Sequence, residues 1–320
     1  MADPILQVVD LTMHYLTRQG EVKAVDGVSF DLERGQVLGL VGESGCGKTS
    51  VAMSLMRLLP DNARLIGGRV LLDGQDLLAM GEDQVRKYRG RRISMVFQAA
   101  MNSLDPVYRV GDQILEAIEA HDPDITTPEA RETITRLFRL VGLDPQLMER
   151  YPHEYSGGMR QRAVIAMALA CQPDVVIADE PTTALDVIVQ DRILRQLKEI
   201  QSDLGMSMVY ITHDIAVVAE VTDQIGVMYA GKLVELGDTG QVFAKPIHPY
   251  TAALLSVSPS IRGEKRTLTT LAGEPPNLID PPQGCRFHPR CPYATEVCQR
   301  EEPPIVERDN HWAACWNPLE

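Results

Sequence analysis

The strongest indication of the fold lies in residues 37–49, Val37-Leu38-Gly39-Leu40-Val41-Gly42-Glu43-Ser44-Gly45-Cys46-Gly47-Lys48-Thr49. Its first five residues form an unbroken apolar run, which is typical of a strand buried on both faces of a parallel sheet. A glycine-rich loop follows directly, and residues 50–59 have a helical periodicity that stops at Pro60. Strand, loop and helix therefore follow one another as in a phosphate-binding βα unit, where curled backbone N–H groups and a helix N-terminus face the phosphate.

The loop fits the Walker A pattern, Gly-x-x-x-x-Gly-Lys-Thr. In this pattern the Lys48 ammonium reaches the β and γ phosphates, and the Thr49 hydroxyl coordinates Mg²⁺. The sequence therefore predicts an ATP-binding loop made of Gly42, Glu43, Ser44, Gly45, Cys46, Gly47, Lys48, Thr49 and Ser50.

Composition narrows the class of protein. The chain has 320 residues, of which 44% are hydrophobic, and 31 basic residues against 44 acidic ones give a net charge of −13. This hydrophobic content supports a core and excludes wholesale disorder. The acidic surplus argues against general binding to nucleic acid. The longest apolar run, residues 163–171, is about half of what a membrane-spanning helix needs, and the first residues do not resemble a secretory leader. We expect a soluble, cytoplasmic protein.

Strand and helix signals alternate along most of the chain, which predicts a parallel α/β sheet. Strand signals are missing over about residues 100–160, where Glu, Arg, Leu and Ile recur at helical spacing. This pattern predicts a helical insertion. Prolines become frequent beyond residue 240. We therefore predict a nucleotide-binding domain over residues 1–240 and a loop-rich C-terminal extension over residues 241–320.

A second apolar strand, residues 175–178, ends in two carboxylates, Asp179 and Glu180. A buried parallel strand delivers its last residues to the carboxyl edge of the sheet, where open α/β folds bind ligands. We expect Asp179 to bind Mg²⁺ and Glu180 to orient or deprotonate an attacking water.

Ser156-Gly157-Gly158 opens a further helix and predicts a second anion site, because it combines a hydroxyl with bare backbone N–H groups at a helix N-terminus. One chain does not need two γ-phosphate sites for one nucleotide. Two chains that face each other head to tail do need them, so we expect each ATP to be shared between two chains.

These motifs together resemble the ATP-binding subunit of an ABC transporter. Ser156-Gly157-Gly158-Met159 matches the family signature, with Met where Gln is commoner. The resemblance makes Tyr15 the aromatic that stacks on adenine. It makes Gln98 the Q-loop glutamine, which reaches the metal and the water and senses the membrane partner. Thr183-Ala184-Leu185-Asp186 is similar to the D-loop that crosses the dimer interface, and His213 to the switch histidine that touches the γ-phosphate.

The resemblance implies a P-loop NTPase (RecA-like) α/β core with an antiparallel β subdomain and a helical insertion subdomain. It also implies that two ATP molecules close a dimer of ATP-binding subunits and that hydrolysis opens it. The implied catalytic residues are Glu180, His213 and Gln98, and Mg²⁺ is held by Thr49, Gln98 and Asp179. The implied ATP contacts include Tyr15, the loop of residues 42–50, Ser156, Gly157, Gly158 and Asp186.

Two stretches resemble the importers of di- and oligopeptides. Residues 98–106 with 110–114 resemble their extended Q-loop, with Asp105 where Asn is often found, and residues 248–255 resemble their C-terminal hallmark. This branch implies an ATPase that is peripheral at the cytoplasmic face of the inner membrane. Its partners would be a second ATP-binding subunit, two transmembrane permease subunits and an extracytoplasmic substrate-binding protein. We favour a heterodimer of ATPases, with a homodimer as the alternative.

Other assignments remain open within this resemblance. Relatives carry nickel complexes or oligosaccharides, so the cargo is not fixed by the hallmark. A non-transport ABC ATPase is the rival class, but the chain has one cassette and no long coiled-coil insertion, and it is acidic.

Four cysteines, Cys285, Cys291, Cys298 and Cys315, gather in the C-terminal extension. Their spacings exceed the two to four residues usual within zinc pairs, and four thiolates suit a 4Fe–4S cluster. Similar tails in the peptide-importer family are associated with such a cluster, which we therefore rank first. Zinc, with His288 or His311 as further ligands, is the second interpretation, and unligated thiols or disulfides are the third. A metal centre would stabilise a tail with few other structural signals.

Overall fold

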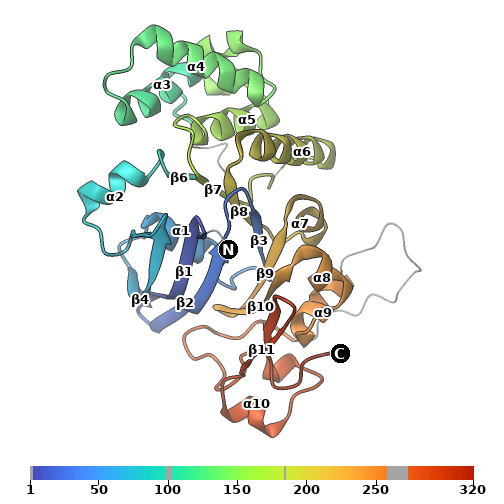
Figure 1. Cartoon of the computed structure of the whole chain (residues 1–320). Helices are drawn as coiled ribbons and strands as arrows, with labels where there is room; N and C mark the ends of the chain where they lie inside the picture. The colour runs from blue at the N-terminus through green and yellow to red at the C-terminus, as the bar shows by residue number, and fades with distance from the viewer. Residues whose placement is uncertain (1–2, 99–102, 184, 258–272) are drawn as a thin grey trace. The chain divides into compact units, whose positions relative to one another are not determined.

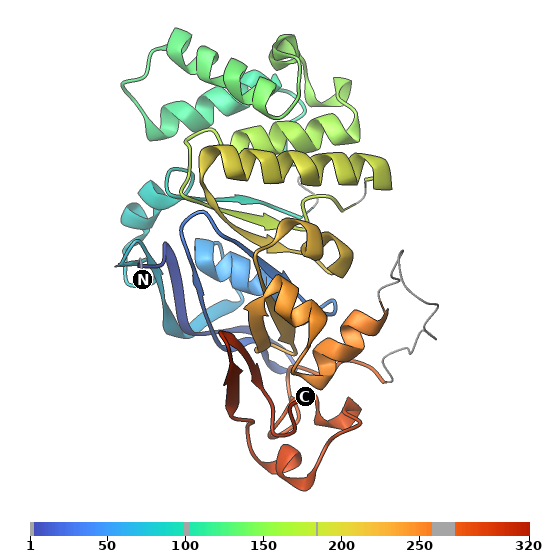
Figure 2. The ribbon, with the colours of Figure 1, turned by 45° about the vertical axis from the view of Figure 1, so that its right-hand side comes forward.

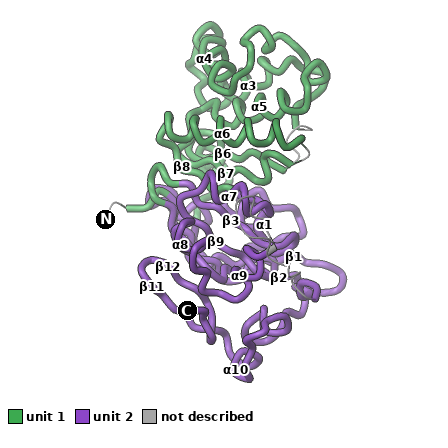
Figure 3. The backbone as a smooth tube through the Cα atoms, turned by 90° about the vertical axis from the view of Figure 1, so that its right-hand side faces the viewer, with its two compact units in different colours: residues 1–5, 33–36, 79–210 green, residues 6–32, 37–78, 211–320 purple. Residues whose placement is uncertain are grey.

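The computed structural model describes residues 3–98, 103–183, 185–257 and 273–320. The chain divides into two compact units (Figure 3). Unit 1 contains residues 1–5, 33–36 and 79–210, and unit 2 contains residues 6–32, 37–78 and 211–320.

Unit 2 contains an antiparallel sheet of four strands in the order β2-β1-β4-β5 (Figure 1). The strands are β1 (Leu6–Thr17), β2 (Gly20–Leu32), β4 (Ala63–Leu72) and β5 (Gln75–Asp76). The sequence predicts shorter β runs here, at residues 7–9, 22–25 and 28–32. In the structure Asp10 has a positive φ of 48° and lies where the pairing register of β1 shifts, so β1 continues through an irregularity of the bulge type.

Unit 2 also contains five strands in the order β11-β12-β10-β9-β3. They are β3 (Val37–Val41), β9 (Gln224–Tyr229), β10 (Lys232–Asp238), β11 (Ile305–Arg308) and β12 (His311–Ala314). Strands β3 and β9 run parallel, and all five residues of β3 are buried, as its continuous apolar run predicts. The helices of this unit are α1 (Lys48–Met56), α7 (Ile215–Val221), α8 (Thr239–Ala244), α9 (Pro249–Val257) and α10 (Glu296–Arg300), with a 3₁₀ turn at His288–Arg290.

The C-terminal extension is loop-rich, as predicted, but it also supplies the hairpin β11–β12, which the sequence analysis did not predict. Asp309 and Asn310 join the two strands, and both have positive φ. Two consecutive residues with positive φ are the requirement of a type I′ hairpin turn, and Asp and Asn tolerate this conformation better than most residues. The hairpin joins the sheet because β12 pairs with β10.

Unit 1 contains the strands β6 (Ile93–Val96), β7 (Val175–Asp179) and β8 (Ser207–Ile211), in the order β8-β7-β6. Ile211, the last residue of β8, is assigned to unit 2. Its helices are α2 (Glu82–Tyr88), α3 (Val110–His121), α4 (Thr127–Leu140), α5 (Gly157–Ala168) and α6 (Val187–Leu204), with 3₁₀ turns at Pro145–Glu149 and Pro152–Glu154.

The predicted helical insertion corresponds to α3, α4 and the two 3₁₀ turns, and the α/β fold class is confirmed. Helices α3 and α4 pack against each other and both contact α5, while α6 runs alongside α5 (Figures 1 and 2). Helix α4 begins with a capping box, in which the Glu129 carboxylate accepts from the backbone N–H and the hydroxyl of Thr126. Among the helices of the described ranges, none is both long enough and apolar enough to cross a membrane.

Candidate functional site

The predicted phosphate-binding loop lies in unit 2, between the end of β3 and the start of α1. Two of its glycines have no room for a side chain. Gly42 has a φ of +149°, and a Cβ there would lie 2.2 Å from the carbonyl oxygen of Met228. Gly47 has a φ of +109°, and a Cβ there would lie 2.1 Å from the carbonyl oxygen of Ala24. The loop therefore packs directly on neighbouring backbone, which only glycine allows at these positions.

The Lys48 side chain is buried and curls back onto this loop. Its Nζ donates to the carbonyl oxygens of Gly42 at 2.8 Å and Glu43 at 3.1 Å, and it lies 3.6 Å from Cys46 Sγ. Burial raises the pKa of the Cys46 thiol despite the neighbouring ammonium. Cys46 is therefore a buried neutral thiol that packs within the loop, whereas Ser44, Gly45 and Thr49 are exposed.

Unit 2 brings another predicted ATP-binding residue to the start of α1. The hydroxyls of Tyr15, on β1, and Ser50, in the first turn of α1, lie 3.1 Å apart, within hydrogen-bonding distance. Tyr15 is only half buried, so part of its ring faces solvent. His213 is exposed in the turn that precedes α7.

In unit 1, β7 delivers two carboxylates to its carboxyl end, as predicted. Asp179 is its last residue and is buried. Glu180 follows with a left-handed φ of 47°, a strained conformation that is often found at functional sites. The Glu180 Oε2 accepts hydrogen bonds from the Gln98 amide at 3.0 Å and from the Thr183 hydroxyl at 2.9 Å. The structure therefore brings the predicted Q-loop glutamine and the predicted catalytic carboxylate together.

The signature residues also lie in unit 1, at the N-terminus of α5. Ser156 is exposed and caps this helix, because its Oγ accepts from the Met159 N–H at 3.3 Å. Gly157 and Gly158 form the first turn, and a Cβ on Gly158 would lie 2.7 Å from a methyl carbon of Val189. Because glycine has no side chain, the backbone N–H groups of Gly157 and Gly158 are not covered by side chains of these two residues.

Asp186, from the predicted D-loop, caps α6 through a 2.9 Å bond from the Val189 N–H to its carboxylate. Ala184 of the same loop lies outside the described residues, as do Ala99, Ala100, Met101 and Asn102 of the predicted extended Q-loop.

The predicted site residues form two groups, one on each unit. Unit 2 carries Tyr15, the loop of residues 42–50 and His213. Unit 1 carries Gln98, Ser156, Gly157, Gly158, Asp179, Glu180 and Asp186. Within each unit the contacts above connect residues that are far apart in sequence.

Sequence reasoning missed two side chains that contact predicted site residues. Thr183 was assigned to the D-loop but not to Glu180, which its hydroxyl contacts. Arg290 was not singled out, and its guanidinium binds the Glu43 carboxylate 247 residues away. A single sequence carries no signal for an ion pair at this separation, whereas the short spacing from Glu180 to Thr183 could have indicated the first contact.

The four cysteines of the C-terminal extension line one small cavity in unit 2, together with His288. All four are free of disulfides. Burial raises the pKa of the thiols of Cys285, Cys291 and Cys315. The structure thus gathers the predicted ligands in one place. However, no group of three or more His, Cys, Asp or Glu side chains within the described ranges is arranged to hold a metal ion, so the predicted metal centre is not confirmed.

His311, considered as a zinc ligand, has a different role in the structure. Its Nε2 lies 2.6 Å from Oε1 of Glu235, a fully buried carboxylate. Glu235 also accepts the backbone N–H groups of Ile247 at 2.7 Å and His248 at 2.9 Å. His311 therefore ties the β11–β12 hairpin to β10.

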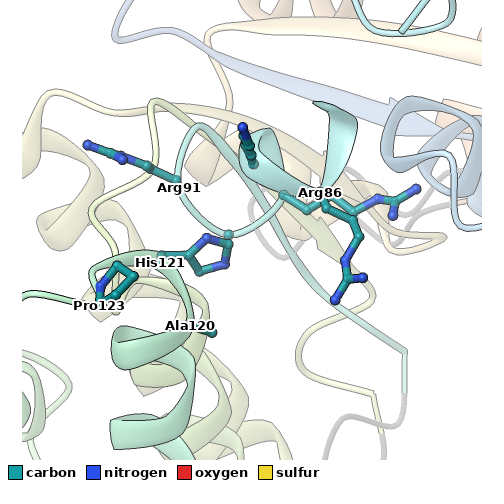
Figure 4. Close-up of a pocket in the computed structure, with 8 residues that line it drawn as sticks. Arg86, Arg91, Ala120, His121 and Pro123 are labelled. Atoms are coloured by element: carbon teal, nitrogen blue, oxygen red, sulfur yellow. The ribbon is translucent and has the colours of Figure 1, made fainter. Parts of the chain in front are cut away.

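A cavity of about 620 Å³ in unit 1 contains none of the predicted site residues (Figure 4). It lies between the end of α2, the turn before β6 and the end of α3, and its lining is rich in cationic side chains: Arg86, Lys87, Arg89 and Arg91. His121 also faces it, and burial, followed by the nearby Arg91 charge, lowers the pKa of this imidazole.

Comparison with known proteins agrees with these motifs. Residues 25–183 match the family model described as "ABC transporter", and residues 234–298 match "Oligopeptide/dipeptide transporter, C-terminal region". The chain is 47% identical to a probable peptide ABC transporter ATP-binding protein of Sinorhizobium fredii, over 100% of this chain and 96% of that protein. It is 46% identical to the dipeptide transport ATP-binding protein DppD of Bacillus subtilis, over 98% and 95% of the two chains. It is 44% identical to the oligopeptide transport ATP-binding protein OppD of Escherichia coli, over 100% and 95%.

Solved structures share the fold. The dimeric structure of a bacterial ABC transporter cassette superposes with a TM-score of 0.66 at 25% identity, covering 73% of this chain and 98% of that one. The structure of CbiO1 from Clostridium perfringens, described as part of an ABC transporter complex, superposes with a TM-score of 0.65 at 28% identity, covering 76% and 92%. The chain therefore belongs to the ABC transporter family of ATP-binding proteins, in its oligopeptide and dipeptide transporter branch.

Proposed function

We propose that this chain is the ATP-hydrolysing subunit of an importer of di- or oligopeptides. The observation that carries the proposal is the arrangement after β7, where Glu180 is held by Gln98 and Thr183, in a chain whose relatives are named as peptide transport ATP-binding proteins. These two hydrogen bonds fix the orientation of the Glu180 carboxylate. In ATPases with these motifs, a carboxylate at this position orients the attacking water.

We assign ATP binding to residues of unit 2. The loop of residues 42–50 cradles the phosphates through its backbone N–H groups, Lys48 binds the β and γ phosphates, and Tyr15 stacks on the adenine. His213, exposed before α7, contacts the γ-phosphate. Thr49, Gln98 and Asp179 would supply oxygen ligands, which suit Mg²⁺, and Mg²⁺ held by them would neutralise charge on the phosphates.

We propose that the active form is a dimer of ATPases, in which Ser156, Gly157 and Gly158 bind the γ-phosphate of the partner's ATP. The exposed position of Ser156 supports this role, since a phosphate on another chain can reach it. Val187 and Ile188 follow the D-loop residue Asp186 and are 80% and 82% exposed. An apolar pair this exposed is suited to contact with a second chain. A heterodimer with a second ATPase is our preferred arrangement.

Permease subunits form the other contact. Val107 and Tyr108 lie between the Q-loop glutamine and α3, and they are 70% and 59% exposed. We propose that this surface helps transmit the state of the ATP site to two transmembrane subunits, with the chain peripheral at the cytoplasmic face of the membrane. An extracytoplasmic binding protein delivers the peptide.

The test of the proposed function is Glu180→Gln in the complex purified with its permease subunits. A general base contributes about 10²–10⁴-fold to rate, so ATP hydrolysis should fall at least about a hundredfold while ATP binding persists. Bound nucleotide, measured after rapid gel filtration, should be ATP in the variant and ADP in the wild type. Steady-state hydrolysis at the wild-type rate would refute the role given to Glu180.

We further propose that Cys285, Cys291, Cys298 and Cys315 hold a 4Fe–4S cluster within an extension that begins near residue 241. Four thiols around one cavity are the donor set that such clusters use. Bound there, the cluster would stabilise the fold of the extension.

This second proposal is tested on protein purified without oxygen. Absorbance near 400 nm, with iron and sulfide assays, should report one cluster per chain, and Cys298→Ser should remove it. A colourless, iron-free protein that contains one zinc per chain would overturn the proposal in favour of zinc.

A further inference from the structure

The segment from Cys285 to Cys291 connects the cysteine cavity with the phosphate-binding loop. Both of its cysteines line the cavity. Its two arginines, Arg286 and Arg290, point to the loop and to the backbone that supports it, and all of these residues belong to unit 2.

Arg290 makes the direct contact. Its two terminal nitrogens donate to the two carboxylate oxygens of Glu43, at 2.7 Å and 2.9 Å. The Arg290 side chain is only 5% exposed, and its guanidinium also lies over the Tyr229 ring, 5.7 Å from the ring centroid. A two-bond contact of this kind fixes orientation as well as distance, and it is stronger than a contact between neutral groups.

Glu43 passes this restraint to the residues that bind phosphate. Its backbone N–H donates to the Tyr250 hydroxyl at 3.0 Å, and its carbonyl oxygen accepts from Lys48 Nζ at 3.1 Å. Both backbone groups of Glu43 and its side chain are thus held at once. The second residue of the loop therefore has little freedom to turn while Arg290 is bound.

Arg286 supports the same loop from a second side. Its guanidinium donates to the carbonyl oxygen of Ala230 and to the carboxylate of Asp26. The next residue, Gly231, donates its N–H to the carbonyl oxygen of Cys46 in the loop at 2.8 Å. Arg286 therefore restrains Cys46 indirectly, through the backbone of Ala230 and Gly231.

Aromatic packing makes the segment stiff. The ring of Phe287, between the two arginines, packs against Tyr229 with the centroids 5.2 Å apart and against Tyr250 at 5.3 Å. All three rings are buried. Movement of the arginines away from the loop would require this cluster to open.

We propose that Arg290 is a positioning residue for nucleotide binding, with Arg286 as its support. The segment Cys285–Cys291 holds the phosphate-binding loop in its binding shape, so that the loop does not have to be ordered when ATP arrives. Pre-organisation of this kind raises affinity without adding a contact to the ligand. The inference rests on the proposed function, because it takes the loop of residues 42–50 as the ATP site.

The experiment measures binding of a fluorescent ATP analogue, mant-ATP with Mg²⁺, to the full-length chain. Arg290→Gln should raise the Kd at least tenfold. Arg290→Lys, which keeps the charge but loses the two-bond fork, should raise the Kd by an intermediate factor. In the assembled complex, the KM for ATP should rise with Kd, while kcat at saturating ATP stays within about twofold of the wild type, since Arg290 is not placed at the reacting atoms.

Glu43→Gln provides the second arm of the test and does not depend on the folding of the arginine variant. It should raise the Kd as well, and the double variant with Arg290→Gln should bind no more weakly than the worse single variant, because both changes break one interaction. Arg300→Gln is the matched control. It removes an exposed ion pair of the same extension, Arg300 Nη2 to Glu296 Oε2 at 3.3 Å, which involves neither the loop nor Arg286, so it should leave Kd unchanged.

Three outcomes would overturn the inference. The first is an unchanged Kd in folded Arg290→Gln and Glu43→Gln, and the second is an additive effect in the double variant. The third is a loss of affinity in Arg300→Gln as large as that in Arg290→Gln, which would indicate a general weakening of the extension. If the wild-type chain itself fails to bind mant-ATP, the proposed function fails first, and that result is distinct from all three.

Discussion

The Gln98 amide donates a hydrogen bond to the Glu180 carboxylate, with 3.0 Å between Nε2 and Oε2. The two residues are 82 positions apart, but they follow β6 and β7, which are parallel neighbours. Because parallel strands present their carboxyl ends at the same edge, the residue that we propose responds to the permease and the residue that we propose acts on water come into contact. In this proposal a change at Gln98 would reach Glu180 directly.

The Thr183 hydroxyl is the other donor to Glu180. We expect Thr183→Val to lower kcat of the assembled complex about ten- to a hundredfold, since a hydrogen bond to a charged group contributes about 1.5–3 kcal/mol and the valine methyl cannot donate. Thr183→Ser keeps the hydroxyl and should retain most of the activity. If Val and Ser variants hydrolyse ATP at the same rate, the hydroxyl does not position Glu180.

The contact between His311 and Glu235 predicts a stability effect. His311→Ala should lower the free energy of unfolding by about 3 kcal/mol, because it leaves a buried carboxylate without one of its partners. Urea unfolding of the full chain measures this change. Glu307→Ala, an exposed position in the same hairpin, should change stability by less than about 0.5 kcal/mol. A loss below about 1 kcal/mol for His311→Ala would show that the pair does not stabilise the hairpin.

His121 should titrate at a lower pH than an ordinary histidine, because burial and, second, the Arg91 charge lower its pKa. The unfolded chain then binds this proton at a higher pH than the folded chain does. The contribution of His121 to stability is therefore largest above the unfolded pKa and decreases as the pH falls below it.

NMR titration of the His121 ring protons measures this pKa, with His121→Gln used for assignment. Arg91→Met should raise the pKa toward its ordinary value, because it removes one of the two causes. Lys87→Met, in the same cavity lining, should have a smaller effect. An equal rise in both variants would assign the shift to the whole cationic lining rather than to Arg91.

Local patterns in the sequence predicted the parts of the fold that depend on neighbouring residues. The strand at residues 37–41, the glycine loop and the following helix were all predicted, because the apolar run, the glycines and the helical spacing occur in one short stretch. The helix start at Ser156 was predicted for the same reason, since a serine N-cap directly before a helical pattern indicates a helix N-terminus.

Other features depend on residues that meet only in the folded chain. The full length of β1 was not predicted. The strand continues past Asp10 through a register shift, which depends on its pairing with a neighbouring strand. The strands of the β11–β12 hairpin have only four residues each, and the hairpin gains stability from β10 and from Glu235. The pairing of Glu43 with Arg290 spans 247 residues, and spacing within a single sequence cannot indicate it.

Whether this chain drives peptide import can be measured as peptide uptake by proteoliposomes that contain the assembled importer, its binding protein and ATP at the side of this chain. We predict that the wild-type complex hydrolyses ATP and accumulates peptide. We predict that a complex with Lys48→Ala in this chain assembles normally but has lost most of both activities, because it lacks the ammonium that we propose binds the β and γ phosphates. Uptake by the Lys48→Ala complex at the wild-type rate would contradict the account, since another ATPase would then drive transport.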